Sequence, residues 1–305
     1  TGVRHTGVSL LPGEERGTQM TYEEVVDQIN QIRRFGNLAG VEVAGRMLKA
    51  LGSPQAGIPL IHIAGTNGKG SVSAFLRSVF ECAGLKTGMF TSPHLVDFRE
   101  RIQVQGDMIS KADTMRLGNR LLSMDFGVYP TMFDYCLAMA LLYFKEQKCD
   151  VVILETGLGG RLDATSATED PEVCVITSIG LDHMEYLGDT VEQIASEKAG
   201  IIRPGVPVFY AQSTEESDRV IEKTAAQQGS SCKKIGKDAY EILGIEDKHI
   251  AFSCTNAYYG TTTWKLNNIG SYQPGNALLA MEVMQYLFRE KGHVDRWREA
   301  LAQVK

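Results

Sequence analysis

The chain has 305 residues, 43% of them hydrophobic and 22% charged, with a formal net charge of −6. This composition is typical of a globular protein, and the basic residues are scattered, which argues against a nucleic-acid-binding surface. The six cysteines form no CxxC pair and lie mostly in apolar stretches, so free buried thiols are expected. No apolar run approaches membrane-spanning length, so we expect a cytoplasmic monomer without a membrane partner.

The first segment, residues 1–19, is glycine-rich and shows no hydrophobic period, so it is interpreted as an N-terminal extension or a cloning remnant. Met20 is a plausible natural start, because Thr21 and Glu24 form the sequence pattern of a helix capping box. A helix through Ile32 follows. We expect residues 20–305 to form one domain.

A phosphate-binding loop is predicted at residues 65–71, GTNGKGS, between an apolar strand at 60–64 and an amphipathic helix. Glycines let backbone N–H groups surround an anion, and the helix start adds partial positive charge. Lys69 could neutralise phosphates and Ser71 could bind magnesium. The spelling departs from the Walker pattern, since Gly70 separates lysine from serine. The alternative is a plain strand–helix turn with an exposed lysine.

The rest of the chain alternates strands and helices, which predicts an α/β fold with a doubly wound, mostly parallel sheet of the P-loop type. Such sheets bind ligands at the carboxyl ends of their strands. A small antiparallel addition is expected at 249–265. Further strands are expected at 87–91, 101–106, 151–155, 173–177 and 206–210, and helices at 41–51, 110–124, 131–146, 190–200, 214–228, 275–290 and 293–304.

Polar residues follow three of these strands. The loop 92–95 (SPHL) follows one strand, while Glu155 and His183 follow two others. A carboxylate and an imidazole that converge beside a phosphate loop suit a divalent cation, and magnesium prefers oxygen ligands. The alternative is that Glu155 caps a turn and His183 is a core histidine.

A lysine lies on the apolar face of a predicted helix. Lys198 shares that face with Val191 and Ile194. Burial would lower the pKa of its amine, which could then react with carbon dioxide to give a carbamate that binds metal. A lysine that extends to solvent near the helix C-terminus is the alternative, and periodicity leaves both open.

Five further side chains are weaker candidates. Asn276 could hydrogen-bond the edge of a purine base, or it could cap the helix that it opens. Arg161 and Asp163, in a glycine-rich turn, could bind substrate or pair with each other. Arg99 and Arg101 could contact an anionic substrate, although a solvated charge run is the default for such residues.

The chain resembles the folylpolyglutamate synthase/dihydrofolate synthase family of the ATP-dependent Mur ligase superfamily. The resemblance extends from about Met20 to Lys305. It rests on GTNGKGS (65–71), TSPHL (91–95), RERIQV (99–104), ETGLGGRLDAT (155–165), TSIGLDH (177–183), EKAGI (197–201) and QPGNA (273–277).

The resemblance implies a function for each of these motifs. It implies an enzyme that binds ATP and Mg²⁺, carbamylates Lys198, and binds its pterin substrate beside the TSPHL loop. The implied residues are Thr66, Asn67, Gly68, Lys69, Gly70, Ser71 and Asn276 for the nucleotide, Ser71, Ser92, Glu155, His183 and Lys198 for metal, and Pro93, His94 and Leu95 for the acceptor.

The implied reaction adds L-glutamate to a folate or dihydropteroate carboxylate through an acyl phosphate, with release of ADP and phosphate. Lys69, His183 and Lys198 would be its catalytic residues. Family enzymes continue into a smaller Rossmann-like C-terminal domain, and this sequence stops at Lys305, so we expect either a truncated chain or a stand-alone ATPase domain. The alternatives are a nucleotide-binding module without catalysis and a Mur-type ligase for another carboxylate.

Overall fold

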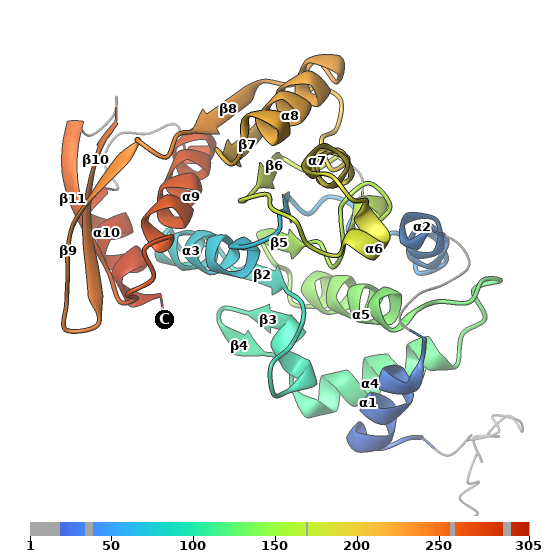
Figure 1. Cartoon of the computed structure of the whole chain (residues 1–305). Coiled ribbons are helices and arrows are strands. Elements are labelled where there is room, and N and C mark those ends of the chain that lie inside the picture. The colour runs from blue at the N-terminus through green and yellow to red at the C-terminus, as the bar shows by residue number, and fades with distance from the viewer. Residues whose placement is uncertain (1–18, 34–38, 169, 257–259, 289–293, 305) are drawn as a thin grey trace, which may run out of the picture.

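A mixed sheet of eight strands forms the centre of the computed structural model, which describes residues 19–33, 39–168, 170–256, 260–288 and 294–304 (Figure 1). The predicted extension, apart from residue 19, lies outside the described residues. The strand order is β4-β3-β2-β5-β1-β6-β7-β8. The pairs β2–β3 and β3–β4 are antiparallel and the other neighbouring pairs are parallel, so the predicted fold class is confirmed. The strands are β1 Leu60–Ala64, β2 Thr87–Phe90, β3 Ile102–Val104, β4 Asp107–Met108, β5 Val151–Glu155, β6 Val173–Ile176, β7 Val208–Ala211 and β8 Cys232–Ile235.

Helices cover both faces of the sheet, because side chains of the buried strands alternate between two cores. In β1, Ile61 and Ile63 face one core, and Leu60 and Ala64 face the other side. The first face carries α3 (Lys69–Cys82), α9 (Gln273–Phe288) and α10 (Val294–Gln303). The opposite face carries α1 (Tyr22–Gln31), α2 (Gly40–Ala50), α4 (Lys111–Leu122), α5 (Met132–Glu146), α6 (Met184–Leu187), α7 (Val191–Ala199) and α8 (Glu215–Gln227).

A small antiparallel sheet lies outside α9 and α10, at one end of the molecule (Figure 1). It contains β9 (Tyr240–Glu246), β10 (His249–Asn256) and β11 (Gly260–Leu266). The antiparallel addition is therefore confirmed, but the prediction missed β9. This edge strand leaves apolar side chains such as Leu243 half exposed, so its sequence has no clean alternation.

The boundaries of some helices differ from the prediction. The helix α9 begins at Gln273 rather than at residue 275, so Asn276 lies inside its first turn and does not cap it. The turn α6 was missed because four residues carry no period.

None of the helices in the described ranges is long and apolar enough to cross a membrane. All six cysteines are free, and only Cys82 and Cys232 are exposed.

Candidate functional site

The loop 65–71 leaves the carboxyl end of β1 and is fastened to the segment that follows β6. The backbone N–H of Thr66 donates to the carbonyl of Ser178 at 2.8 Å, and the Thr66 hydroxyl accepts from the Gly180 N–H at 3.1 Å. The Ser178 hydroxyl donates to the carbonyl of Asn67 at 3.1 Å. These bonds fix the loop before any ligand is present.

Two glycines of this loop lie closer to neighbouring segments than any side chain permits. Gly65 has a φ of +151°, and a Cβ there would lie 1.8 Å from the Thr177 hydroxyl oxygen. Gly68 has a φ of +91°, and its Cβ would lie 2.6 Å from the Asn276 side-chain oxygen. No side chain caps α3, which begins directly after Gly68, so its first N–H groups are suited to an anion.

The ammonium group of Lys69 lies over this loop. Its Nζ donates to the carbonyls of Gly65 at 3.1 Å and Thr66 at 3.5 Å, and lies 4.0 Å from Glu155 Oε1. The lysine side chain is 17% exposed, so a phosphate could reach it. The predicted phosphate-binding lysine therefore has a suitable position, and the alternative of an exposed lysine is wrong.

Glu155, the last residue of β5, is a buried carboxylate beside Lys69. Burial raises its pKa to about 7, whereas the Lys69 charge and the backbone N–H of Ser92 lower it. A buried carboxylate fits magnesium, which takes oxygen ligands. Within the described ranges no three His, Cys, Asp or Glu side chains gather into a metal site, so a cation here would also need hydroxyls and ligand phosphates.

Lys198, on α7, lies beneath the phosphate loop. Its side chain is almost fully buried, and Nζ donates to the Gly65 carbonyl at 2.8 Å. Burial and the positive charge of Lys69 lower its pKa to about 8, whereas Asp182 and Asp163 raise it. The buried interpretation is therefore confirmed, and the solvent-reaching alternative is wrong.

His183 lies at the exit of β6, as predicted, in a left-handed conformation with a φ of +49°. Its ring is 54% exposed, with Nε2 3.6 Å from Asp182 Oδ2, so it is not a core histidine. Asp182 is also one of the charges that act on Lys198. Lys69 and Lys198 share the Gly65 carbonyl, and Lys69 lies 4.0 Å from Glu155, whereas the ion-pair partner of His183 is the neighbouring Asp182.

The loop after β2 uses its charged residues internally. The Arg101 Nε donates to His94 Nδ1 at 2.8 Å, and Arg101 is buried. Arg99 pairs with Asp97 at 2.7 Å. The predicted solvated charge run is therefore wrong, because each arginine supports the loop backbone or a neighbouring side chain. Their contacts with substrate stay predictions, as do those of Pro93 and Leu95.

The glycine-rich turn after β5 is also closed by its own side chains. Asp163 is buried and its carboxylate accepts from the backbone N–H groups of Gly157, Leu158 and Thr165 at 2.9–3.0 Å. Arg161 pairs instead with Glu197, at 2.7 Å. The alternative that Arg161 and Asp163 pair with each other is therefore wrong.

Gln273 is a site residue that the sequence reasoning missed. Its Nε2 donates to the Ser71 hydroxyl, and its Oε1 accepts from the Asn276 amide, both at 3.1 Å. The two side chains therefore join the start of α9 to the start of α3. The sequence carried no clear signal for this role, because polar side chains are common at the start of a helix.

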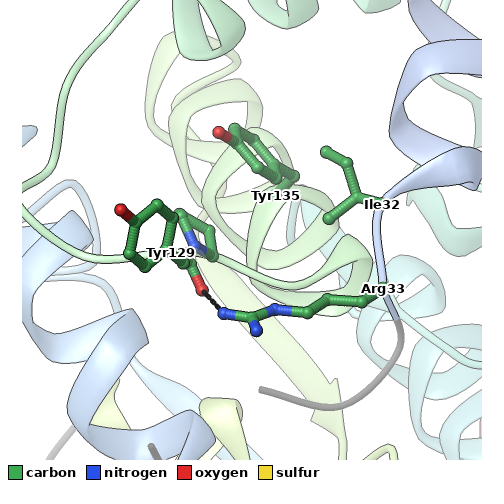
Figure 2. Close-up of a pocket in the computed structure, with 5 residues that line it drawn as sticks. Ile32, Arg33, Tyr129 and Tyr135 are labelled. Carbon is green, nitrogen blue, oxygen red and sulfur yellow. Dashed lines mark hydrogen bonds between the residues drawn. The ribbon is translucent and has the colours of Figure 1, made fainter. Parts of the chain in front are cut away.

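A pocket of about 410 Å³ lies beside the N-terminus of α5 (Figure 2). The Arg33 guanidinium donates to the Tyr129 carbonyl at 3.4 Å. Phe133, at the start of α5, lies against Gly157, two residues after Glu155, so this end of the helix is near the carboxyl end of β5. It is lined by Ile32, Arg33, Tyr129, Pro130 and Tyr135.

A parallel sheet whose central strand runs through a glycine-rich loop into an uncapped helix, with a lysine over the loop, defines an α/β domain of the P-loop nucleotide-binding type. The family model for the Mur ligase middle domain matches residues 63–284, and the chain belongs to this family.

Several relatives and solved structures resemble the chain. It is 39% identical over 280 residues to the dihydrofolate synthase/folylpolyglutamate synthase of Bacillus subtilis, covering 88% of this chain and 64% of that protein. The apo form of L. casei FPGS superposes with a TM-score of 0.84 at 28% identity, over 94% of this chain and 72% of that one. An FPGS-AMPPCP-folate complex gives a TM-score of 0.83 at 29% identity, with the same coverages. The predicted resemblance is confirmed, and the chain spans about two thirds of these proteins.

Proposed function

We propose that this chain is the ATP-binding part of a ligase that joins L-glutamate to a carboxylate of a folate or dihydropteroate. The observation that carries the proposal is the Lys69 ammonium over an uncapped helix start, 4.0 Å from the buried Glu155. The names of the relatives support the choice of substrates, since they are folylpolyglutamate and dihydrofolate synthases.

The reaction proceeds in two steps. A carboxylate oxygen of the acceptor attacks the γ-phosphorus of ATP, the bond to the bridging oxygen breaks, and ADP leaves. The glutamate amine then attacks the carbonyl carbon of the acyl phosphate, loses a proton and expels phosphate. In the first step Lys69 and the N–H groups of residues 68–71 neutralise charge that spreads over the transferring phosphoryl oxygens. Asn276 and Gln273 hold the loop against α9 and contact the nucleotide.

The oxygen atoms of Ser71, Ser92 and Glu155 are suited to hold Mg²⁺, which would offset phosphate charge when bound. His183 and a carbamate on Lys198 would hold a second ion near the attacking carboxylate. The buried amine of Lys198 supports this assignment, because a lowered pKa leaves more of it neutral and able to react with carbon dioxide.

We propose that the acceptor binds between the loop 92–95 and the aromatic pocket of Figure 2. The tyrosines and proline of that pocket offer flat apolar surfaces for a fused ring, and Arg33 brings a positive charge. The cytoplasmic location and the monomeric state stay predictions.

The test is release of ADP from MgATP with dihydropteroate or tetrahydrofolate, each with and without glutamate. ADP release that needs both acceptor and glutamate supports the ligase. MgATP binding without such release would favour a nucleotide-binding module instead. Turnover with a UDP-muramoyl substrate and none with a pterin would indicate a Mur-type ligase.

A further inference from the structure

One carboxylate holds the loop that follows β2. Glu100 Oε2 accepts from the Leu95 N–H at 2.7 Å, and Oε1 accepts from the N–H groups of Val96 and Asp97 at 2.9 and 2.7 Å. Three consecutive backbone donors on a single anion form strong, charge-assisted bonds. The backbone of residues 95–97 is therefore held by the Glu100 side chain.

The hydrogen bonds from Asp97, Leu95 and Val96 lower the pKa of Glu100, so its ionised form holds the loop. The neighbouring Asp97 adds a second constraint, because its carboxylate accepts from the Arg99 N–H at 2.9 Å and caps the short 3₁₀ helix Phe98–Arg101. Both constraints act on the backbone and leave the side chains at the tip unrestrained.

The tip of this loop carries two apolar side chains in water. Leu95 is 89% exposed and Val96 is 91% exposed. Because Glu100 fixes their backbone, the exposure belongs to a defined conformation. Two adjacent, outward aliphatic side chains on a fixed backbone offer an apolar surface, and a ligand that covers them gains the free energy of burying it.

The base of the same loop reaches the proposed nucleotide site. The backbone N–H of Ser92 bonds to Glu155, whose carboxylate lies 4.0 Å from the Lys69 ammonium. An acceptor whose carboxylate reaches the γ-phosphate would therefore extend past residues 93–96. In a pteroate that carboxylate is attached to an aromatic ring, and in a folate the same ring lies further along the molecule, beyond the glutamyl side chain.

We propose that Glu100 is a positioning residue for the acceptor: it holds residues 95–97 so that Leu95 and Val96 contact the aromatic ring of the acceptor. The inference rests on the proposed function, and it adds a residue that itself touches neither ATP nor acceptor. Glu100 acts through the backbone, and the two aliphatic side chains make the contact.

Glu100→Ala tests this on the whole chain, with direct binding of dihydropteroate and tetrahydrofolate measured beside their KM values. We expect the Kd and KM for the acceptor to rise at least tenfold, whereas the KM for ATP stays within twofold. Glu100→Gln, which keeps one acceptor oxygen, should recover part of the loss. Amide hydrogen exchange at residues 95–97 should accelerate in both variants.

Two comparisons separate the contact from mere loop stability. Leu95→Ala combined with Val96→Ala should raise the acceptor Kd while exchange at residue 97 stays slow. Glu146→Ala, which breaks a surface pair with Arg116, is the control and should change neither.

Faster exchange in Glu100→Ala with an unchanged acceptor Kd would overturn the inference and leave the proposed function standing. Wild-type protein that binds MgATP but neither acceptor would overturn both.

Discussion

Two glycine-rich turns follow the paired parallel strands β1 and β5, and they differ in whether the chain fills their backbone N–H groups itself. We call the loop 65–71, after β1, the open loop, and the turn after β5, which Asp163 closes, the closed turn. In the turn after β5, the Asp163 carboxylate accepts three backbone N–H groups, so the chain supplies its own anion. In the loop after β1, no side chain caps α3, and the ammonium groups of Lys69 and Lys198 both donate to the Gly65 carbonyl. Such a turn is available to a phosphate only where the chain leaves its donors unfilled.

The largest effect should follow from removing the Lys69 ammonium group from the open loop. Lys69→Ala should lower ADP release by roughly 100-fold or more, because preorganised charge on the phosphoryl oxygens is lost. The protein should stay folded, since the ammonium bonds to two loop carbonyls and its ion-pair partner Glu155, whose pKa burial raises to about 7, can take up a proton when the positive charge is lost. Coupled ADP assays and urea unfolding measure the two effects, with the exposed Lys49→Ala as control. Unchanged turnover would remove the phosphate-loop assignment.

The second lysine tests the proposed carbamate. Lys198→Ala should be inactive, and a short carboxylate such as acetate should restore part of the activity by replacing the carbamate oxygens. Activity of the variant without any additive would exclude the carbamate. Rescue by an amine in place of a carboxylate would indicate that the ammonium itself acts.

A glycine of the open loop should be irreplaceable for steric reasons. Gly65→Ala should lower the unfolding free energy by about 3 kcal/mol, because the new Cβ meets Thr177 and the φ of +151° is unfavourable for alanine. Gly180→Ala is the matched control in the adjoining segment, where a Cβ would meet nothing within 4 Å. Equal unfolding midpoints for the two variants in urea would contradict the close approach.

A substitution in the closed turn should lower the unfolding free energy. Asp163→Asn replaces one carboxylate oxygen by an NH₂ group, which then faces backbone donors. We expect a loss of about 2 kcal/mol in unfolding free energy, the cost of leaving buried donors unsatisfied. Thermal or urea unfolding measures it. An unchanged unfolding free energy together with lost acceptor binding would show instead that Asp163 contacts the substrate.

The sequence predicted the sheet and the open loop, because buried strands and apolar helix faces have clear periods. It singled out the loop 65–71 by Lys69 and the helix that follows, but it did not show that the turn after β5 fills its own backbone donors. The difference depends on where Asp163 folds back, which is a tertiary contact. The same holds for Arg99 and Arg101, whose partners Asp97 and His94 are close in sequence but fixed by the loop geometry.

Gln273 and the burial of Lys198 show the same limit. Helical periodicity placed Lys198 on an apolar face, but only packing against the loop decides that its amine bonds to Gly65. Gln273 belongs to a helix whose start was predicted two residues late, so its bond to Ser71 could not be foreseen.

The smallest effect concerns His62, which joins the two regions. It lies in β1, beneath the open loop, and its Nε2 is 2.8 Å from the hydroxyl of Thr165 in the closed turn. Burial lowers the pKa of His62 from 6.5 to about 3. Between these values the unfolded chain binds a proton that the folded chain does not, so the unfolding free energy falls as the pH falls.

The expected loss attributable to this histidine is about 1 kcal/mol between pH 6.5 and 5.5. Urea unfolding of wild type and His62→Gln at both pH values isolates it, because acidic groups contribute equally to the two proteins. The variant should be less sensitive to acid by that amount, whatever its stability at pH 7. Parallel pH profiles would mean that His62 can take up its proton while folded, and the contact that couples β1 to the closed turn would then be looser than the 2.8 Å distance implies.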